Sequence, residues 1–242
     1  MSSSPIFPKI LLIGASGRIA TCVIPELKLD FRLVLCSTQK LIRDSDQCLS
    51  RNSFHIDPSS PDKSEVAIRE IAEHHPDIST VLFFSGGSWL TEEQSQRPYE
   101  NTFEKNTMFP LRCLDFFINC ISPRQIRFIF FSSGAIHKPS SGIAYASAKA
   151  YLELAVRGLC KQFASTNLSF SMIRLGYVRT PDRYHEQLRK VDYASYLEKL
   201  SLLWPNFSPI ECNDIVKTIR YIHTLDAIAT NGLFIDLSGA RD

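Results

Sequence analysis

The sequence predicts a single α/β domain built on a doubly wound parallel sheet. Short apolar runs alternate with helical stretches from one end of the chain to the other, which is the pattern of successive βα units. The first run ends in a turn of small residues, 14–20, that opens a helix. No linker interrupts the 242 residues, a length that one such domain can fill. We therefore expect 1–242 to form one domain.

The composition excludes several classes of protein. A net charge of +2 gives no reason to expect nucleic acid or an anionic membrane as partner. No run approaches a membrane span, and the N-terminus lacks the features of a signal peptide. The seven cysteines are scattered and show no zinc-type spacing, so we expect neither a metal site nor a disulfide framework. These observations predict a cytoplasmic protein.

The first strand, Lys9–Ile13, is a continuous apolar run, as in strands buried on both faces. A turn with the pattern Gly-x-x-Gly-x-x-Ala follows it, and a helix is expected from about 18 to 27. Small residues let the backbone approach a pyrophosphate, and the helix N-terminus offers free N–H groups. This predicts a Rossmann-type dinucleotide turn; the alternative is an ordinary strand-to-helix turn. The residues expected to bind the dinucleotide here are Gly14, Ser16, Gly17, Arg18 and Ile19.

The end of the second strand, Phe31–Cys36, bears on the choice of cofactor. In dinucleotide folds an acidic residue near this point holds the ribose 2′-OH of NAD. No carboxylate appears here before Asp44, while Arg18, Lys40 and Arg43 are placed to face a 2′-phosphate. The sequence therefore favours NADP (NADPH) over NAD. The alternative is that these cations lie on a solvated surface.

The remaining runs continue the alternation of strand and helix. Strands are expected over 53–57, 80–84, 127–131, 170–175 and 233–237, and helices over 62–75, 99–121, 143–165 and 213–225. His74 and His75 are adjacent and point in different directions on a helix, so a helix C-terminus explains them better than a metal site. The segment 182–209 mixes aromatic and charged residues. We interpret it as a lid over the site; a pair of surface helices that makes dimer contacts is the alternative.

The strand over 127–131 delivers Ser132 and Ser133 to its carboxyl end, and the next helix carries Tyr145 and Lys149. Residues four apart share one face of a helix. An ammonium beside a phenol favours the phenolate and lowers its pKa, so Tyr145 is a candidate general acid or base. Ligands of open parallel sheets bind at the carboxyl ends of strands. We therefore expect a site that moves a proton on and off a carbonyl oxygen, although the Tyr-x-x-x-Lys spacing also fits a plain surface helix.

Taken in order, these landmarks resemble the short-chain dehydrogenase/reductase family over nearly the full chain. The resemblance implies a catalytic tetrad of Asn106, Ser133, Tyr145 and Lys149, with Ser132 as the alternative serine. It also implies contacts with the adenine, with the turn after the fourth strand and with the nicotinamide end. The residues so assigned to the cofactor are Asp57, Ser85, Gly86, Tyr145, Lys149, Gly176, Val178 and Thr180.

The resemblance implies a mechanism as well. NADPH gives a hydride to a carbonyl carbon, Tyr145 donates the proton, and Ser133 holds the substrate oxygen. Lys149 lowers the pKa of Tyr145 and binds the nicotinamide ribose, and Asn106 holds a water in a proton relay. The expected partners are a small-molecule carbonyl or alcohol and further copies of the chain, as a homodimer or homotetramer.

The chain also departs from the family pattern. Its cofactor turn is nearer to that of extended and atypical members, the usual Asn-Asn-Ala-Gly element is replaced by 85–87, and Leu175 stands where the family has Pro. These departures leave the substrate open. Two alternative functions also stay open: an NADP-binding regulatory or scaffold protein without turnover, and a nucleotide-sugar epimerase or dehydratase.

Overall fold

The computed structural model describes residues 7–38, 52–87, 97–121, 124–137, 142–181, 192–203 and 207–237. A seven-stranded sheet with the order β3-β2-β1-β4-β5-β6-β9 runs through these residues, and every neighbouring pair of strands is parallel. The order reverses direction between β1 and β4, which confirms the predicted doubly wound sheet.

The strands of this sheet are β1 (Lys9–Ile13), β2 (Arg32–Ser37), β3 (Ser53–His55), β4 (Ile78–Phe83), β5 (Ile126–Ser133), β6 (Leu168–Leu175) and β9 (Phe234–Leu237). A second small sheet pairs β7 (Val178–Arg179) with β8 (Ile210–Glu211). The helices are α1 (Arg18–Leu27), α3 (Pro61–His74), α5 (Pro98–Phe103), α6 (Phe109–Cys120), α7 (Ile143–Gln162), α9 (Tyr193–Leu203) and α10 (Cys212–Thr224). A π-helical turn, η1 (Glu104–Met108), joins α5 to α6, and a 3₁₀ turn, η2 (Gly134–His137), follows β5.

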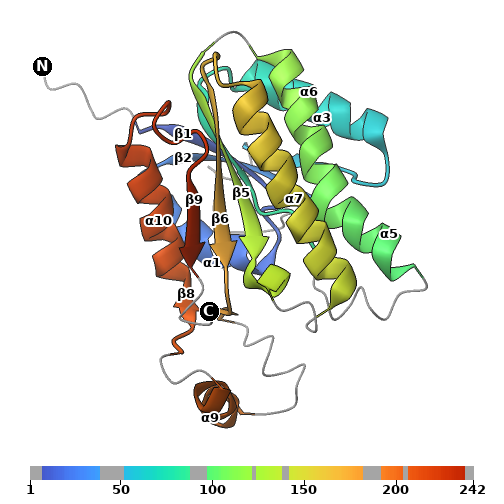
Figure 1. The fold of residues 1–242 in the computed structure, drawn as a ribbon. Coiled ribbons are helices and arrows are strands. Elements are labelled where there is room, and N and C mark those ends of the chain that lie inside the picture. Colours follow the sequence, from blue (N-terminus) through green and yellow to red (C-terminus); the bar gives the residue numbers. More distant parts are fainter. Residues whose placement is uncertain are drawn as a thin grey trace, which may run out of the picture.

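Helices cover both faces of the large sheet (Figure 1). One apolar core lies between the sheet and α3, α6 and α7, and the other lies between the sheet and α1 and α10. Because both faces are covered, the strands read as nearly continuous apolar runs rather than as alternating ones. Stacked phenylalanines tie β4 to β5, with ring centroids 4.3 Å apart for Phe83 and Phe130 and 4.1 Å apart for Phe84 and Phe131.

The predicted helix over 99–121 is interrupted by η1, which the apolar pattern does not reveal. Pro110 has no N–H to donate to the carbonyl of Asn106, four residues earlier, so the regular α-helical bonding cannot be complete here. A π-helical turn absorbs the defect and places Asn106 in the buried interior. His74 and His75 end α3, as predicted.

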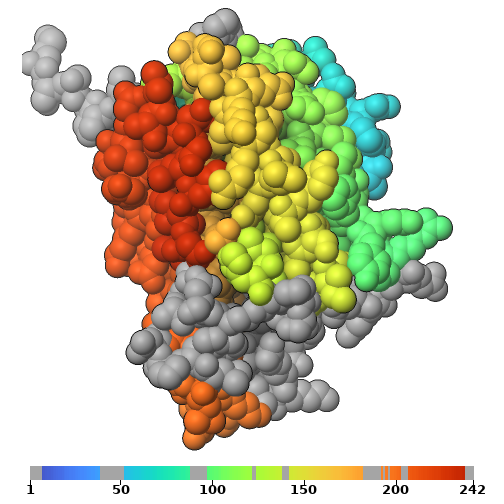
Figure 2. Space-filling model, viewed as in Figure 1, coloured from blue at the N-terminus to red at the C-terminus, as the bar shows by residue number. Residues whose placement is uncertain are grey.

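One part of the predicted lid, α9, lies in the described residues. It stands beyond the edge at which the strands of the large sheet end (Figure 1), and its atoms are the orange ones at the bottom of Figure 2. Residues 182–191 and 204–206 lie outside the described residues. Across the described ranges, no helix has the length and hydropathy that a bilayer crossing requires.

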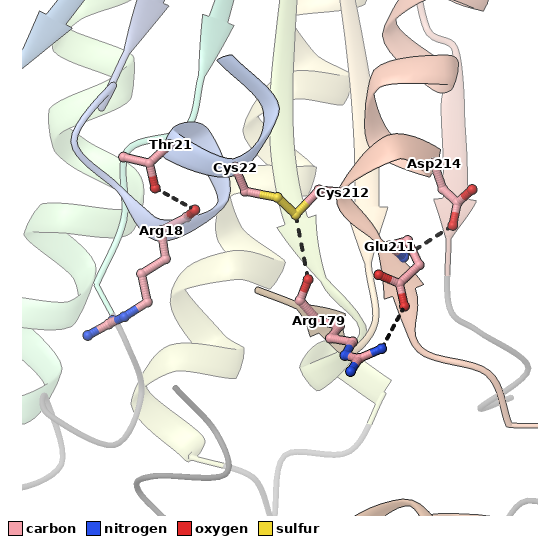
Figure 3. Close-up of a disulfide and its surroundings, with 7 residues drawn as sticks. All are labelled: Arg18, Thr21, Cys22, Arg179, Glu211, Cys212 and Asp214. Carbon is pink, nitrogen blue, oxygen red and sulfur yellow. Dashed lines mark hydrogen bonds and ion pairs between the residues drawn. A yellow bond between two sulfur atoms is a disulfide. The ribbon is translucent and has the colours of Figure 1, made fainter. Parts of the chain in front are cut away.

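A disulfide joins Cys22 of α1 to Cys212, the first residue of α10 (Figure 3). The Cα atoms lie 6.0 Å apart, within the usual range for a bonded pair, although the two cysteines are 190 positions apart in the sequence. This separation is why spacing gave no sign of the pairing. The sequence analysis did not predict this bond. Cys36, Cys113, Cys120 and Cys160 are free thiols.

Candidate active site

The turn after β1 is fixed to the end of β2 by its own backbone. The N–H groups of Gly14 and Ala15 both donate to the carbonyl of Cys36, at 2.8 and 3.0 Å, and the N–H of Gly17 donates to the carbonyl of Gly14 at 2.9 Å. The helix α1 then begins at Arg18 without a side-chain cap from the described residues. The first N–H groups of this helix are therefore donors of the kind that bind phosphate.

Gly14 is required at this turn for two reasons. Its φ of +88° lies in the left-handed region, and a Cβ atom on it would stand 2.6 Å from the backbone N of Ser85. The turn after β1 therefore packs directly on the turn after β4. The structure brings together the two small-residue turns that the sequence analysis assigned to the cofactor.

Asn106 and Lys149 converge above Gly86. A Cβ atom on Gly86 would lie 2.6 Å from Asn106 Oδ1 and 3.4 Å from Lys149 Nζ. The Asn106 side chain is buried and donates through Nδ2 to the carbonyl of Thr102 at 3.0 Å. Within the described part of the chain, Asn106 Oδ1 and the Ser85 hydroxyl are buried without a hydrogen-bond partner. Such atoms are costly, so they indicate a place that a ligand or a water completes.

Ser133, at the end of β5, contacts Tyr145 from the first turn of α7. Burial raises the pKa of the Tyr145 phenol, and a hydrogen bond with the Ser133 side chain lowers it in part. The Ser133 hydroxyl oxygen also accepts from the N–H of Ala135 at 3.2 Å. Of the two serines left open by the sequence, Ser133 is therefore the one beside the phenol.

Lys149 lies near the Tyr145 ring, but the pKa of the phenol is not lowered as the sequence analysis predicts. Its Nζ lies 5.9 Å from the centroid of the Tyr145 ring and donates to the carbonyl of Phe131 at 3.0 Å. Burial lowers the pKa of Lys149 to about 8, because the ammonium loses water. The pKa of Tyr145 lies above its ordinary value, because burial destabilises the phenolate more than the hydrogen bond with Ser133 stabilises it.

The segment after β6 is held at the same edge of the sheet. The N–H of Gly176 donates to the carbonyl of Leu237 at 2.8 Å, and the carbonyl of Tyr177 accepts from Ile210 at 2.9 Å. Val178 and Thr180 are buried. A Cβ atom on Gly134 would lie 3.7 Å from the Cα of Gly176, so this segment adjoins the turn that follows Ser133.

Asp57 lies just after β3, and its carboxylate accepts two hydrogen bonds from Ser59. The Ser59 hydroxyl and N–H donate to Oδ1 at 2.6 and 3.0 Å. The hydrogen bond from the Ser59 hydroxyl is the main reason that the pKa of Asp57 lies below its ordinary value. An adenine contact by Asp57 remains a prediction.

The expected 2′-phosphate pocket is described only in part. Lys40 and Arg43 lie outside the described residues. Arg18 is the first residue of α1, where its carbonyl accepts from the Thr21 hydroxyl at 2.9 Å. In Figure 3 its guanidinium extends away from the disulfide.

Two charged residues near the site were missed by sequence reasoning. Glu153 follows Lys149 by one helical turn, and it pairs with Arg174 of β6 through two hydrogen bonds of 3.0 and 2.8 Å. The sequence does carry a signal for Glu153, because polar residues recur at 145, 149 and 153 on a helix face that is otherwise apolar.

The fold is shared with structures of short-chain dehydrogenases/reductases. A Serratia marcescens short-chain dehydrogenase/reductase is 16% identical, with a TM-score of 0.77 over 97% of this chain and 98% of that chain. An actinorhodin polyketide ketoreductase variant with NADPH is 15% identical, with a TM-score of 0.77 over 96% of each chain. A Brucella ovis oxidoreductase of the same family, with a partially ordered NAD, is 18% identical, with a TM-score of 0.69 over 96% of this chain and 99% of that chain.

No family model and no curated protein sequence matches the chain, so the likeness is one of structure. At this level of identity it establishes the fold. The fold that the resemblance in the sequence implied is thereby confirmed.

Proposed function

We propose that the chain is an oxidoreductase of the short-chain dehydrogenase/reductase family, which uses a nicotinamide cofactor to interconvert a small carbonyl compound and its alcohol. One observation carries the proposal. The Ser133 hydroxyl contacts the partly buried Tyr145 phenol at the edge of the sheet where Asn106 and Lys149 converge over Gly86. Ligands of doubly wound sheets bind at this edge. The structural neighbours with NADPH and NAD support the nicotinamide class of cofactor.

The residues present fit a dinucleotide. The glycine turn and the uncapped start of α1 suit the pyrophosphate, and Gly86 leaves open the space between Asn106 and Lys149. The nicotinamide end would then be held by Lys149 and by the segment 176–180, with Ser85 beside it. When bound, the nicotinamide supplies or accepts the hydride.

The chain itself handles the proton. The Ser133 hydroxyl donates a hydrogen bond to the substrate oxygen, and Tyr145 gives its proton to that oxygen as the carbonyl becomes an alcohol. With a pKa above its ordinary value, the Tyr145 phenol is protonated at neutral pH and has a proton to give. The tyrosinate that remains is reprotonated through Lys149, whose pKa of about 8 permits proton exchange near neutral pH. Asn106 Oδ1 is placed to hold a water in that relay.

Three further points belong to the proposal. NADP is preferred to NAD, on the basis of Arg18, Lys40 and Arg43. The chain assembles as a homodimer or homotetramer through the helices around Asn106 and Tyr145, and exposed Ile143, Tyr151 and Leu154 on α7 support this choice of surface. Its composition favours the cytoplasm, which we propose as its location, whereas the Cys22–Cys212 disulfide is of a kind more common in oxidising compartments.

The test is turnover of a panel of aldehydes and ketones with NADPH, compared between the parent chain and two variants of one helix. Tyr145→Phe removes the acid and should lower turnover by about 10²- to 10⁴-fold. Tyr151→Phe is the matched control, because Tyr151 lies on the same helix and is half exposed. Full activity of Tyr145→Phe on a substrate of the parent chain would disprove the assignment.

A further inference from the structure

An ion cluster lies one helical turn beyond Lys149, with Glu153 buried, Arg174 partly buried and Asp236 exposed. The Arg174 guanidinium donates through Nε and Nη2 to the two oxygens of Glu153, and through Nη1 to Asp236 Oδ2 at 2.6 Å. Glu153 is 6% exposed. The cluster joins α7 to β6 and β9, and across the sheet Arg174 is the partner of both Ser132 and Asp236. Four elements therefore meet at these side chains.

Glu153 is ionised in this environment. Burial raises its pKa, but the hydrogen bonds from Arg174 and the charges of Arg174 and Arg157 lower it, and the net result lies below the ordinary value. Arg157, one turn further along α7, itself packs over the ring of Phe234 at 4.0 Å. The contact between Glu153 and Arg174 is thus a true ion pair.

Two residues at the end of β5 contact two successive turns of one α7 face. Ser133 contacts Tyr145, and the carbonyl of Phe131 accepts from Lys149. Ser132, between them, lies directly opposite Arg174 on β6, and the Arg174 guanidinium binds Glu153 on the next turn of α7. The acid–base pair and the ion pair therefore belong to one seam between α7 and the end of β5.

Stability alone does not explain a charged pair at this place. Apolar side chains of similar volume often stabilise a protein as much as a buried ion pair does. A guanidinium that binds both oxygens of a carboxylate accepts it in only one orientation, which fixes position. Here Asp236 also holds the guanidinium from its other side. The pair thus sets where α7 lies against β5 and β6.

We propose that Glu153 and Arg174 are positioning residues, whose ion pair holds the Tyr145 phenol at the Ser133 hydroxyl. Its consequence for catalysis rests on the proposed function, but the placement itself can be tested without any substrate. Misplacement of a reacting group by about 1 Å can cost on the order of 100-fold in rate.

The test combines Glu153→Leu with Arg174→Met, which replaces the pair by apolar chains and should preserve the fold. Tyr145 is titrated by ultraviolet difference spectroscopy in each background, against the corresponding Tyr145→Phe chain. In the parent chain, Ser133→Ala should raise the midpoint of Tyr145, because it removes the hydrogen bond that lowers its pKa. In the double variant, Ser133→Ala should leave the midpoint of Tyr145 unchanged, because the Ser133 hydroxyl and the Tyr145 phenol are no longer in contact.

The matched control is Arg220→Met, which removes the pair between Arg220 of α10 and Asp30, far from α7. In the Arg220→Met background, Ser133→Ala should raise the midpoint of Tyr145 as it does in the parent chain. An equal effect of Ser133→Ala in the parent and the Glu153→Leu/Arg174→Met background would overturn the proposal. Should the double variant not fold, Glu153→Gln alone takes its place with the same two expected results.

Turnover adds a second readout. The double variant should lose about 10- to 100-fold in kcat, with a much smaller change in NADPH affinity, because the turn at 14–19 is untouched. A parent chain that binds no nicotinamide cofactor would defeat the proposed function, and the Tyr145 titration would still decide whether the pair positions the phenol.

Discussion

Gly86 shows how closely the candidate site is packed at the scale of single residues. Asn106 Oδ1 and Lys149 Nζ both face the space where a side chain at this position would begin. Sequence alone marks Gly86 only as part of a small-residue turn. The structure gives the glycine a specific role, which is to leave that space open.

Gly86→Ala should therefore impair the site. The new Cβ would stand 2.6 Å from Asn106 Oδ1, closer than such contacts occur, so Asn106 or Lys149 must move. We expect turnover to fall by about 10- to 100-fold, together with weaker NADPH binding. The control is Gly158→Ala on α7, where nothing lies within 4 Å of the new atom, and this change should stabilise the helix by up to about 1 kcal/mol. Equal activity of both variants would contradict this role of Gly86.

His223 makes stability depend on pH. Its Nε2 lies 2.9 Å from the Thr80 hydroxyl and its ring lies 4.8 Å from Phe31. Burial, with a smaller effect of the Arg127 charge, lowers its pKa from 6.5 to about 4. Below pH 6.5, His223 is protonated in the unfolded chain but stays neutral in the folded chain. The free energy of unfolding therefore falls as the pH drops towards about 4.

We expect this loss to be about 1 to 3 kcal/mol, since each unit of pKa shift corresponds to about 1.4 kcal/mol and His223 is partly exposed. Urea unfolding of the parent chain at pH 7 and pH 4.5 measures it. His223→Gln should reduce the pH dependence, whereas His74→Gln, at an exposed helix end, should not. The same pH dependence in all three chains would show that His223 is not responsible.

At the scale of elements, the disulfide connects two helices on one face of the sheet. It joins α1, which starts at the candidate cofactor turn, to α10, which follows the β7–β8 pair. A bond that closes so long a loop restricts the unfolded chain and typically stabilises a protein by about 2 to 5 kcal/mol.

Cys212→Ser should lower the free energy of unfolding by that amount, and treatment of the parent chain with a reductant should do the same. Cys120→Ser is the control, because Cys120 is a free thiol at the end of α6. Urea unfolding with and without dithiothreitol measures both effects. Unchanged stability of the parent chain on reduction, with the thiols shown to be free, would contradict a stabilising role for this bond.

The elements themselves differ in how well the sequence predicted them. The strands were predicted because a sheet covered on both faces needs continuous apolar runs, as in β1 and β5. The π-helical turn at Asn106 was missed, because the apolar period carries through it without a break. The strands β7 and β8 have two residues each, too few for a pattern.

At the scale of the whole molecule, the sequence predicted the fold, because glycine turns and strand ends are local signals, and the place of the site stays a prediction. It could not predict interactions between distant residues, such as Cys22 with Cys212 or Glu153 with Arg174. The direction of the Tyr145 pKa was also predicted wrongly, because sequence spacing shows a neighbouring charge and not the loss of water on burial.

The most direct test of the account is a fluorescence titration of the purified chain with NADPH and with NADH, side by side. It needs no knowledge of the substrate and addresses the edge of the sheet on which the proposed function depends. The account predicts saturable binding of NADPH, tighter than that of NADH. Binding of neither cofactor would contradict it, because Gly14, Gly86 and the uncapped start of α1 would then surround a site that holds no dinucleotide.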